Sequence, residues 1–146
     1  PDHSGLFYFV DTYPELDGIR VGVLDQGKFI PQGNRSTLLP EAHVDPMPVA
    51  LEGGGVRLYH SRSLEGILAV SDSKDGFSFG ESRPLQGLSG QVCHAPPERP
   101  SPPDACFLDP SLLLPSEGPA VLYFSVFESL PGGVERRGIG RAFALD

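Results

Sequence analysis

Two aspartates occur in the same local pattern at two places in the chain, and carboxylates are groups that can do acid–base chemistry. Asp45 and Asp109 each precede a proline, and each is followed at the same spacing by a Leu-Tyr-x-Ser segment, at 58–61 and at 122–125. Two carboxylates on opposite sides of a sugar are the minimum for glycoside hydrolysis, one as acid and the other as base or nucleophile. The alternative is structural, because an Asp before Pro also caps the entry to a strand by accepting bonds from backbone N–H groups.

Four other residues could complete such a site. Glu41 is the best candidate for the catalytic acid, and Glu128 is an alternative. His43 could donate a hydrogen bond to a sugar hydroxyl or tune a carboxylate, although a histidine at such a position can equally be a solvated loop residue. Tyr13 lies in a hairpin loop and is a candidate for substrate binding.

The two aspartates belong to a repeated unit, and the repeat has to position them. Gly54 and Gly118 keep the same spacing from their aspartates, as do the apolar residues Val49 and Leu113. Repeats longer than a hairpin and shorter than a domain are typical of propeller blades or solenoid turns. The sequence therefore predicts an architecture of similar β units in succession.

The second unit reads as four antiparallel strands. Alternating or apolar segments separated by Gly-rich turns predict strands at 46–51, 56–61, 66–71 and 77–79. Asp75-Gly76 supplies the positive φ of the last turn, and we expect Asp75 to bond backbone groups there rather than to take part in a site. Four hairpin-linked strands in about 40 residues are typical of a propeller blade.

The other two units are shorter. The pattern of the third unit predicts strands at 111–114, 120–125 and 138–143, with a longer hairpin over 130–137. The pattern of the first unit predicts strands at 6–10, 18–23 and 28–30. The chain thus holds one complete blade and two incomplete blades. Asp45 and Asp109 would each open the innermost strand of a blade, so both carboxylates would face a central channel.

These units predict the fold class and the assembly. We expect an all-β chain with a single β-propeller-like domain over 1–146, blade units at about 5–33, 45–85 and 109–146, and a proline-rich inter-blade loop over 93–105. A propeller closes with about four to eight blades, and unclosed blades leave edges that invite pairing. We therefore favour a homo-oligomer whose copies close the ring together, with membership of a longer propeller as the alternative.

Composition excludes several classes of function. Glycine (18) and proline (16) are abundant in the 146 residues, which favours a turn-rich β protein. The net charge of −8 comes without a basic patch, so we expect neither a nucleic-acid partner nor binding to an anionic membrane. No apolar run is long enough to span a membrane and no signal-peptide pattern opens the sequence. The sequence therefore contains no signal that assigns the protein to a compartment, and its localisation stays open.

The two cysteines flank the proline-rich loop. Cys93 and Cys106 could form one disulfide, but two free buried thiols are the favoured interpretation. A zinc site is not expected, because His94 is next to one cysteine and no second histidine stands at a ligand spacing. The sequence also contains no phosphate-binding loop for a nucleotide cofactor.

The repeated segments resemble the five-bladed propeller glycosidases, a group of arabinanases, xylosidases, invertases, levansucrases and related mannoside phosphorylases. The similarity lies in the Asp-Pro openings, the Leu-Tyr-x-Ser strands, the strands at 66–69 and 138–142, and the hairpin at 73–79. It covers most of the chain from Gly5 onward. These are blade motifs, which are more specific for a fold than for an activity.

The resemblance implies a glycoside hydrolase-like protein that acts on or binds a carbohydrate at the channel mouth. Asp45, Asp109 and Glu41 would be catalytic, His43 and Tyr13 would bind substrate, and no cofactor is required, although an acidic channel could hold calcium. The group's enzymes are longer than this chain, and no Glu here stands in an equivalent motif of the group. The alternative is a non-catalytic propeller-like module that binds a partner or scaffolds an assembly.

Overall fold

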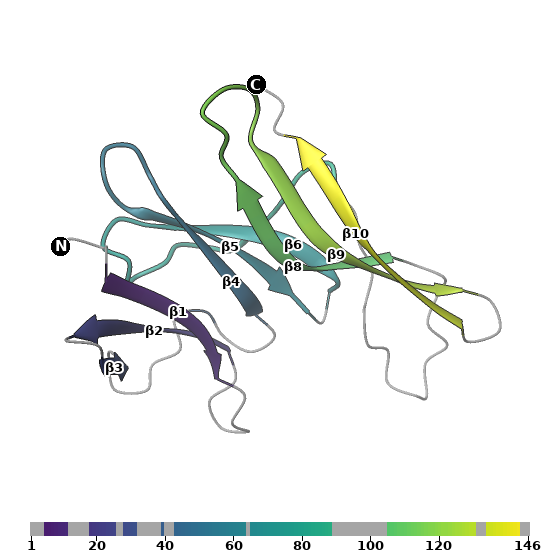
Figure 1. Cartoon of the computed structure of the whole chain (residues 1–146). Coiled ribbons are helices and arrows are strands. Elements are labelled where there is room, and N and C mark those ends of the chain that lie inside the picture. The colour runs from purple at the N-terminus through teal and green to yellow at the C-terminus, as the bar shows by residue number, and fades with distance from the viewer. Residues whose placement is uncertain are drawn as a thin grey trace.

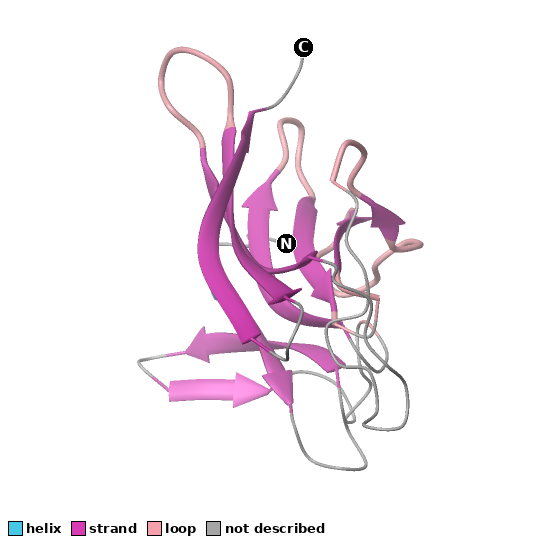
Figure 2. Cartoon of the chain, turned by 90° about the vertical axis from the view of Figure 1, so that its right-hand side faces the viewer, coloured by secondary structure: helices cyan, strands magenta, loops and turns pink. Residues whose placement is uncertain are grey.

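The computed structural model describes residues 5–11, 18–25, 28–31, 39, 43–63, 65–88, 105–130 and 134–143, and every regular element in them is a strand (Figure 2). Ten strands form three antiparallel sheets, which confirms the prediction of an all-β chain. The first sheet holds β1 (Leu6–Asp11), β2 (Gly18–Asp25) and β3 (Lys28–Pro31). The middle sheet holds β4 (His43–Ala50), β5 (Val56–Arg62), β6 (Ile67–Ser73) and β7 (Arg83–Pro84). The third sheet holds β8 (Ala105–Leu113), β9 (Val121–Leu130) and β10 (Val134–Phe143).

The three sheets stand in the order of the chain, with the sheet β4–β7 between the other two (Figure 1). In each sheet the strand that comes first in sequence lies at an edge, so β1, β4 and β8 are the edge strands. β4 contacts both β1 and β8, which places these three edges next to one another. Within the described residues no strand pairing joins the first sheet to the third.

Proline explains why β4 and β8 are edge strands. Pro46 and Pro48 lie in β4, and Pro110 lies in β8. A proline has no N–H to donate to a neighbouring strand, so it is tolerated at a sheet edge or at a bulge and not inside a sheet. The Asp-Pro pairs of β4 and β8 therefore favour strands that pair on one side only.

The alternation of β5 builds a core on each side of the middle sheet. Leu58 is fully buried and packs with Ile19 and Leu39 against the first sheet. Tyr59, the next residue, packs on the opposite side with Leu68 and the third-sheet residues. Because successive side chains of a strand point to opposite faces, one strand contributes to both cores. The second core is completed by Leu122 and Phe124, with Leu85, Leu88, Phe107, Leu112, Val126 and Ala142 around it.

The turn after β6 is organised by two side chains, as the sequence predicted for Asp75. Its Oδ1 accepts hydrogen bonds from the backbone N–H groups of Phe77 and Ser78 at 2.8 and 2.7 Å. The Oγ of Ser73 accepts a bond from the N–H of Gly76 at 2.9 Å. These bonds from backbone N–H groups hold the pKa of Asp75 low, at about 2. The first sheet is attached to this turn through Tyr8, whose hydroxyl donates to the carbonyl of Gly76 at 3.0 Å.

Two details of the predicted strands are wrong. The segment 77–79 is not the fourth strand, because Asp75 engages its N–H groups and only an isolated bridge joins Phe79 to Ser73. The fourth strand is β7, at Arg83–Pro84. The long hairpin expected over 130–137 is also shorter, since β9 and β10 stay in register out to the pair Leu130 and Val134.

The favoured interpretation of the cysteines is also wrong. Cys106 is disulfide-bonded and almost fully buried, and the sequence has only one other cysteine, Cys93, which lies outside the described residues. The regions that the structure describes contain no long apolar helix of the kind that crosses a bilayer.

Candidate functional site: an aspartate pair between two sheets

Asp45 and Asp109 occupy equivalent irregularities in their strands. The register of β4 against β5 shifts between Val44 and Met47, and that of β8 against β9 shifts between Leu108 and Ser111. Each aspartate lies inside its shift with a positive φ, 56° for Asp45 and 52° for Asp109, and no other described non-glycine residue has one. Such a bulge bends an edge strand and re-aims a side chain, and residues in the left-handed region are found preferentially at functional sites.

The two aspartates meet across the boundary between the middle and third sheets. The backbone N–H of Asp109 donates to Oδ2 of Asp45 at 3.3 Å and to Oγ of Ser61 at 3.2 Å. Ser61 is fully buried, and its side chain also hydrogen-bonds to the Asp45 carboxylate. Asp45 and Asp109 therefore converge on one serine of β5. That their carboxylates face a central channel stays a prediction.

The pair has unequal environments. Asp45 is half-buried, whereas Asp109 is exposed. Burial raises the pKa of Asp45, the hydrogen bonds from Ser61 and from the Asp109 N–H lower it, and the nearby Asp109 carboxyl raises it, for a net increase. A buried carboxyl beside a second carboxyl is the arrangement that lets two acids share one proton.

The separation of the pair bears on its chemistry. The backbone N–H of Asp109 donates to the Asp45 carboxylate, and the Asp109 carboxyl raises the pKa of Asp45, so the two carboxyl groups are close enough to interact directly. Such a pair presents adjacent acceptor oxygens on one side of a ligand. Two carboxylates on opposite faces of a sugar would require a further acid, so the catalytic roles of Asp45 and Asp109 stay predictions.

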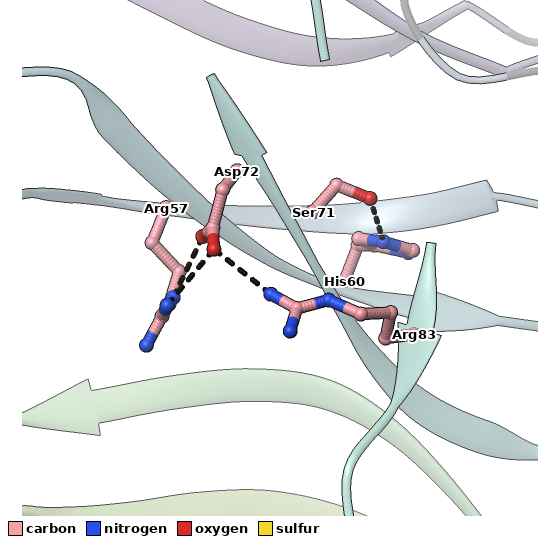
Figure 3. A network of polar contacts seen from close by, with 5 residues as sticks. All are labelled: Arg57, His60, Ser71, Asp72 and Arg83. Carbon is pink, nitrogen blue, oxygen red and sulfur yellow. Dashed lines mark hydrogen bonds and ion pairs between the residues drawn. The ribbon is translucent and has the colours of Figure 1, made fainter. Parts of the chain in front are cut away.

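His43 lies beside a different residue. Its ring packs against that of His60, with 5.0 Å between centroids, on the side of β5 that faces the first sheet. His60 is fully buried and its Nε2 lies 3.3 Å from Oγ of Ser71 and 3.4 Å from Oγ of Ser82, as Figure 3 shows for Ser71. Burial and the neighbouring His43 lower the pKa of His60 to about 4, so its imidazole is neutral at pH 7. A role of His43 in binding a sugar stays a prediction.

A cluster of two arginines and one carboxylate lies farther along the same sheet. Asp72 accepts a bidentate pair of bonds from Arg57 at 2.7 and 2.9 Å and another from Arg83 at 2.8 Å (Figure 3). These guanidinium groups, Arg57 first, lower the pKa of Asp72. Because the three residues come from β5, β6 and β7, the cluster attaches the two-residue strand β7 to its sheet.

The other candidate residues are not brought to the pair by any described contact. Glu41 and Tyr13 lie outside the described residues. Glu128 pairs with Ala105, four residues before Asp109, which is roughly 13 Å along the strand at about 3.3 Å per residue. It forms an ion pair with Arg136 at 2.6 Å in an open pocket over β9 and β10.

Ligands for a metal ion are not grouped in the part of the chain that the structure describes, where no three His, Cys, Asp or Glu residues are suitably placed. The calcium ion that the sequence allowed stays a prediction. Sequence reasoning did not identify Ser61 as the residue that joins the two aspartates. Its signal was present in the repeat, since Ser61 and Ser125 close the two equivalent Leu-Tyr-x-Ser segments.

Comparisons with known proteins provide no family. No family model, no curated protein and no solved structure matches this chain.

Proposed function

We propose that the three sheets are blades of a β-propeller-like protein, and that the Asp45–Asp109 pair binds a carbohydrate at the inner edge of those blades. The observation that carries the proposal is the convergence of two strained aspartates, from equivalent positions of a repeat, on the buried Ser61. Strained residues persist where the surrounding structure holds them, and bulges are frequent beside binding sites.

The chemistry of the pair suits neighbouring sugar hydroxyls. An ionised carboxylate only accepts hydrogen bonds, and bonds to a charged acceptor are about twice as strong as neutral ones. Two adjacent carboxyl groups can therefore accept from two neighbouring hydroxyls of one sugar ring. Because Asp109 is exposed and Asp45 is half-buried, the first is accessible to a ligand while the second is oriented by Ser61.

The proposal is tested by calorimetric titration with arabino-, xylo-, fructo- and manno-oligosaccharides, the sugar classes suggested by the resembling group. We expect one class to bind, and Asp45→Asn and Asp109→Asn each to weaken it by about tenfold or more, since each charged hydrogen bond contributes about 1.5–3 kcal/mol. Asp25→Asn is the matched control, because it removes the same charge from an exposed residue of β2 and should leave affinity unchanged. Sugar binding that survives both site substitutions would exclude this site.

A second function, glycoside hydrolysis with Asp45 as the general acid and a further carboxylate on the other face of the sugar, is favoured by one observation. The pKa of Asp45 is raised by burial and by the Asp109 carboxyl, as a general acid requires. Release of reducing sugar from the bound oligosaccharide, lost in Asp45→Asn, would establish catalysis. Binding without release would leave a carbohydrate-binding module, and absence of both would favour the scaffold alternative.

A further inference from the structure

The third sheet covers one side of the middle sheet. On that side the middle sheet presents Tyr59, Ser61 and Leu68, and both Ser61 and Leu68 are almost completely buried. Leu68 stands opposite Ser61 in the pairing of β5 with β6. Burial of these residues by the next sheet defines what the interface between consecutive units looks like.

The same residues recur on the third sheet, where no described sheet covers them. Tyr123 and Ser125 lie 64 residues after Tyr59 and Ser61 and are their equivalents in the repeat. Ile139 stands opposite Ser125 in the third sheet, as Leu68 stands opposite Ser61 in the middle sheet. Ile139 is nevertheless 83% exposed and Tyr123 is 37% exposed. Among the described residues, the third sheet thus carries this interface of the repeat with no sheet packed on it.

Neighbouring side chains extend this exposed surface. Phe143 and Leu113 both stand opposite Val121, one from each neighbouring strand. Val121 is two positions from Tyr123, so the alternation of β9 puts Phe143, Leu113 and Tyr123 on one face. Phe143 is 52% and Leu113 is 51% exposed. Leu113, Tyr123, Ile139 and Phe143 are called here the outer face of the third sheet. Exposed apolar side chains grouped on one face are typical of an interaction site.

The other end of the stack has a matching surface. Tyr8 and Ile19 of the first sheet pack toward the middle sheet. Phe7 and Leu24, which alternate with them, point the other way and are 47% and 48% exposed. Phe7 and Leu24 are called here the outer face of the first sheet. Both outer faces of the described stack of sheets therefore carry exposed apolar side chains.

We propose that the outer face of the third sheet binds the outer face of the first sheet of a second copy of this chain. The interface would repeat the contact that joins the sheets within one chain, with Ile139 and Tyr123 in the places of Leu68 and Tyr59. It is a head-to-tail interface, in which two different surfaces meet. Two copies together contain six sheets, and propeller rings close with about four to eight blades.

The net charge of the whole chain is compatible with a second copy as the occupant. Arg137 and Arg141 lie on the same side of β10 as Ile139, and each guanidinium lies over a phenylalanine ring, at 5.3 and 5.5 Å. The chain as a whole has a net charge of −8. Arg141 stands directly opposite Tyr123, so the apolar face includes positive charge, which favours an acidic partner over a basic one. This inference rests on the proposed stacking of blades and not on sugar binding.

The assembly is tested by sedimentation equilibrium without any sugar, so that its failure is distinct from failure of carbohydrate binding. We expect the wild-type chain to have twice the chain mass of 15.6 kDa. Ile139→Lys and Phe7→Lys should each give the single-chain mass, because each places a charge in one of the two faces. Phe77→Lys, at an exposed phenylalanine of the β6–β7 turn, is the matched control and should keep the doubled mass.

Mixing the two variants separates a head-to-tail interface from a symmetric one. The Ile139→Lys chain keeps its first-sheet face and the Phe7→Lys chain keeps its third-sheet face, so the mixture should recover the doubled mass. A wild-type chain of single mass, a Phe7→Lys variant that stays double, or a mixture that stays single would each overturn the proposal. Circular dichroism identical to wild type shows that the exposed substitutions leave the fold intact.

Discussion

At the scale of residues, the two aspartates were found from sequence because they share a spacing, and their convergence follows from backbone geometry. Asp-Pro in an edge strand indicates a bulge, since proline cannot continue the ladder. The direct bonds from Asp109 to Asp45 and Ser61 could not be predicted, because they depend on how two sheets pack. His60 was also missed, since nothing in a single histidine indicates whether its neighbours bury it.

A prediction at this scale concerns the buried His60. Its folded-state pKa is about 4 and its unfolded value is about 6.5, so in this window the unfolded chain binds more protons and stability falls as pH decreases. Relative to pH 7, the free energy of unfolding should fall by about 3 kcal/mol at pH 4 through this histidine. His60→Gln should remove this part of the pH dependence of the free energy of unfolding, measured by urea titrations between pH 7 and pH 4.

The control for that prediction is His43→Gln. His43 is half-buried, and the largest cause of the lowered His60 pKa is burial, so most of the slope should persist without His43. An unchanged slope in His60→Gln would mean that His60 is not the residue responsible.

At the scale of elements, alternation and Gly-rich turns were sufficient to place most strands, and side-chain competition explains the failures. The segment 77–79 has a strand-like pattern, but Asp75 binds its backbone first. β7 is only two residues long and is attached by the Arg57–Asp72–Arg83 cluster, so no periodic signal could reveal it. The pairing of β9 with β10 continues past the expected turn because the register remains regular to its end.

A prediction at this scale compares two glycines of β10. A Cβ at Gly140 would lie 2.4 Å from a ring carbon of Phe124, the residue directly opposite, whereas a Cβ at Gly138 would meet nothing within 4 Å. Gly140→Ala should therefore lower the free energy of unfolding by about 1–3 kcal/mol, the usual cost of overpacking. Gly138→Ala should be neutral or raise it by about 0.5–1 kcal/mol, because alanine is less flexible when unfolded. Equal effects in denaturant titrations would contradict the packing of Phe124 over Gly140.

At the scale of the whole molecule, the repeat explains both the site and the unpaired ends. The equivalent edge strands β4 and β8 lie side by side and bring Asp45 and Asp109 together. Each sheet is covered by the next one along the chain except the third, where no sheet among the described residues lies over Ile139. The number of sheets was predictable from sequence, because the repeat can be counted. The ligand was not predictable, because the repeated motifs specify how strands pack and contain little information about what is bound.

Backbone amide NMR during titration with the oligosaccharide that binds surveys the whole molecule in one measurement, and it tests the location of the site most directly. The N–H of Asp109 is bonded to both Asp45 and Ser61, so a sugar held by the acid pair must change its environment. We predict that the largest shifts occur at Asp109, Asp45 and Ser61. Shifts confined to the pocket around Glu128 and Arg136, with these three amides unmoved, would contradict a carbohydrate site at the aspartate pair.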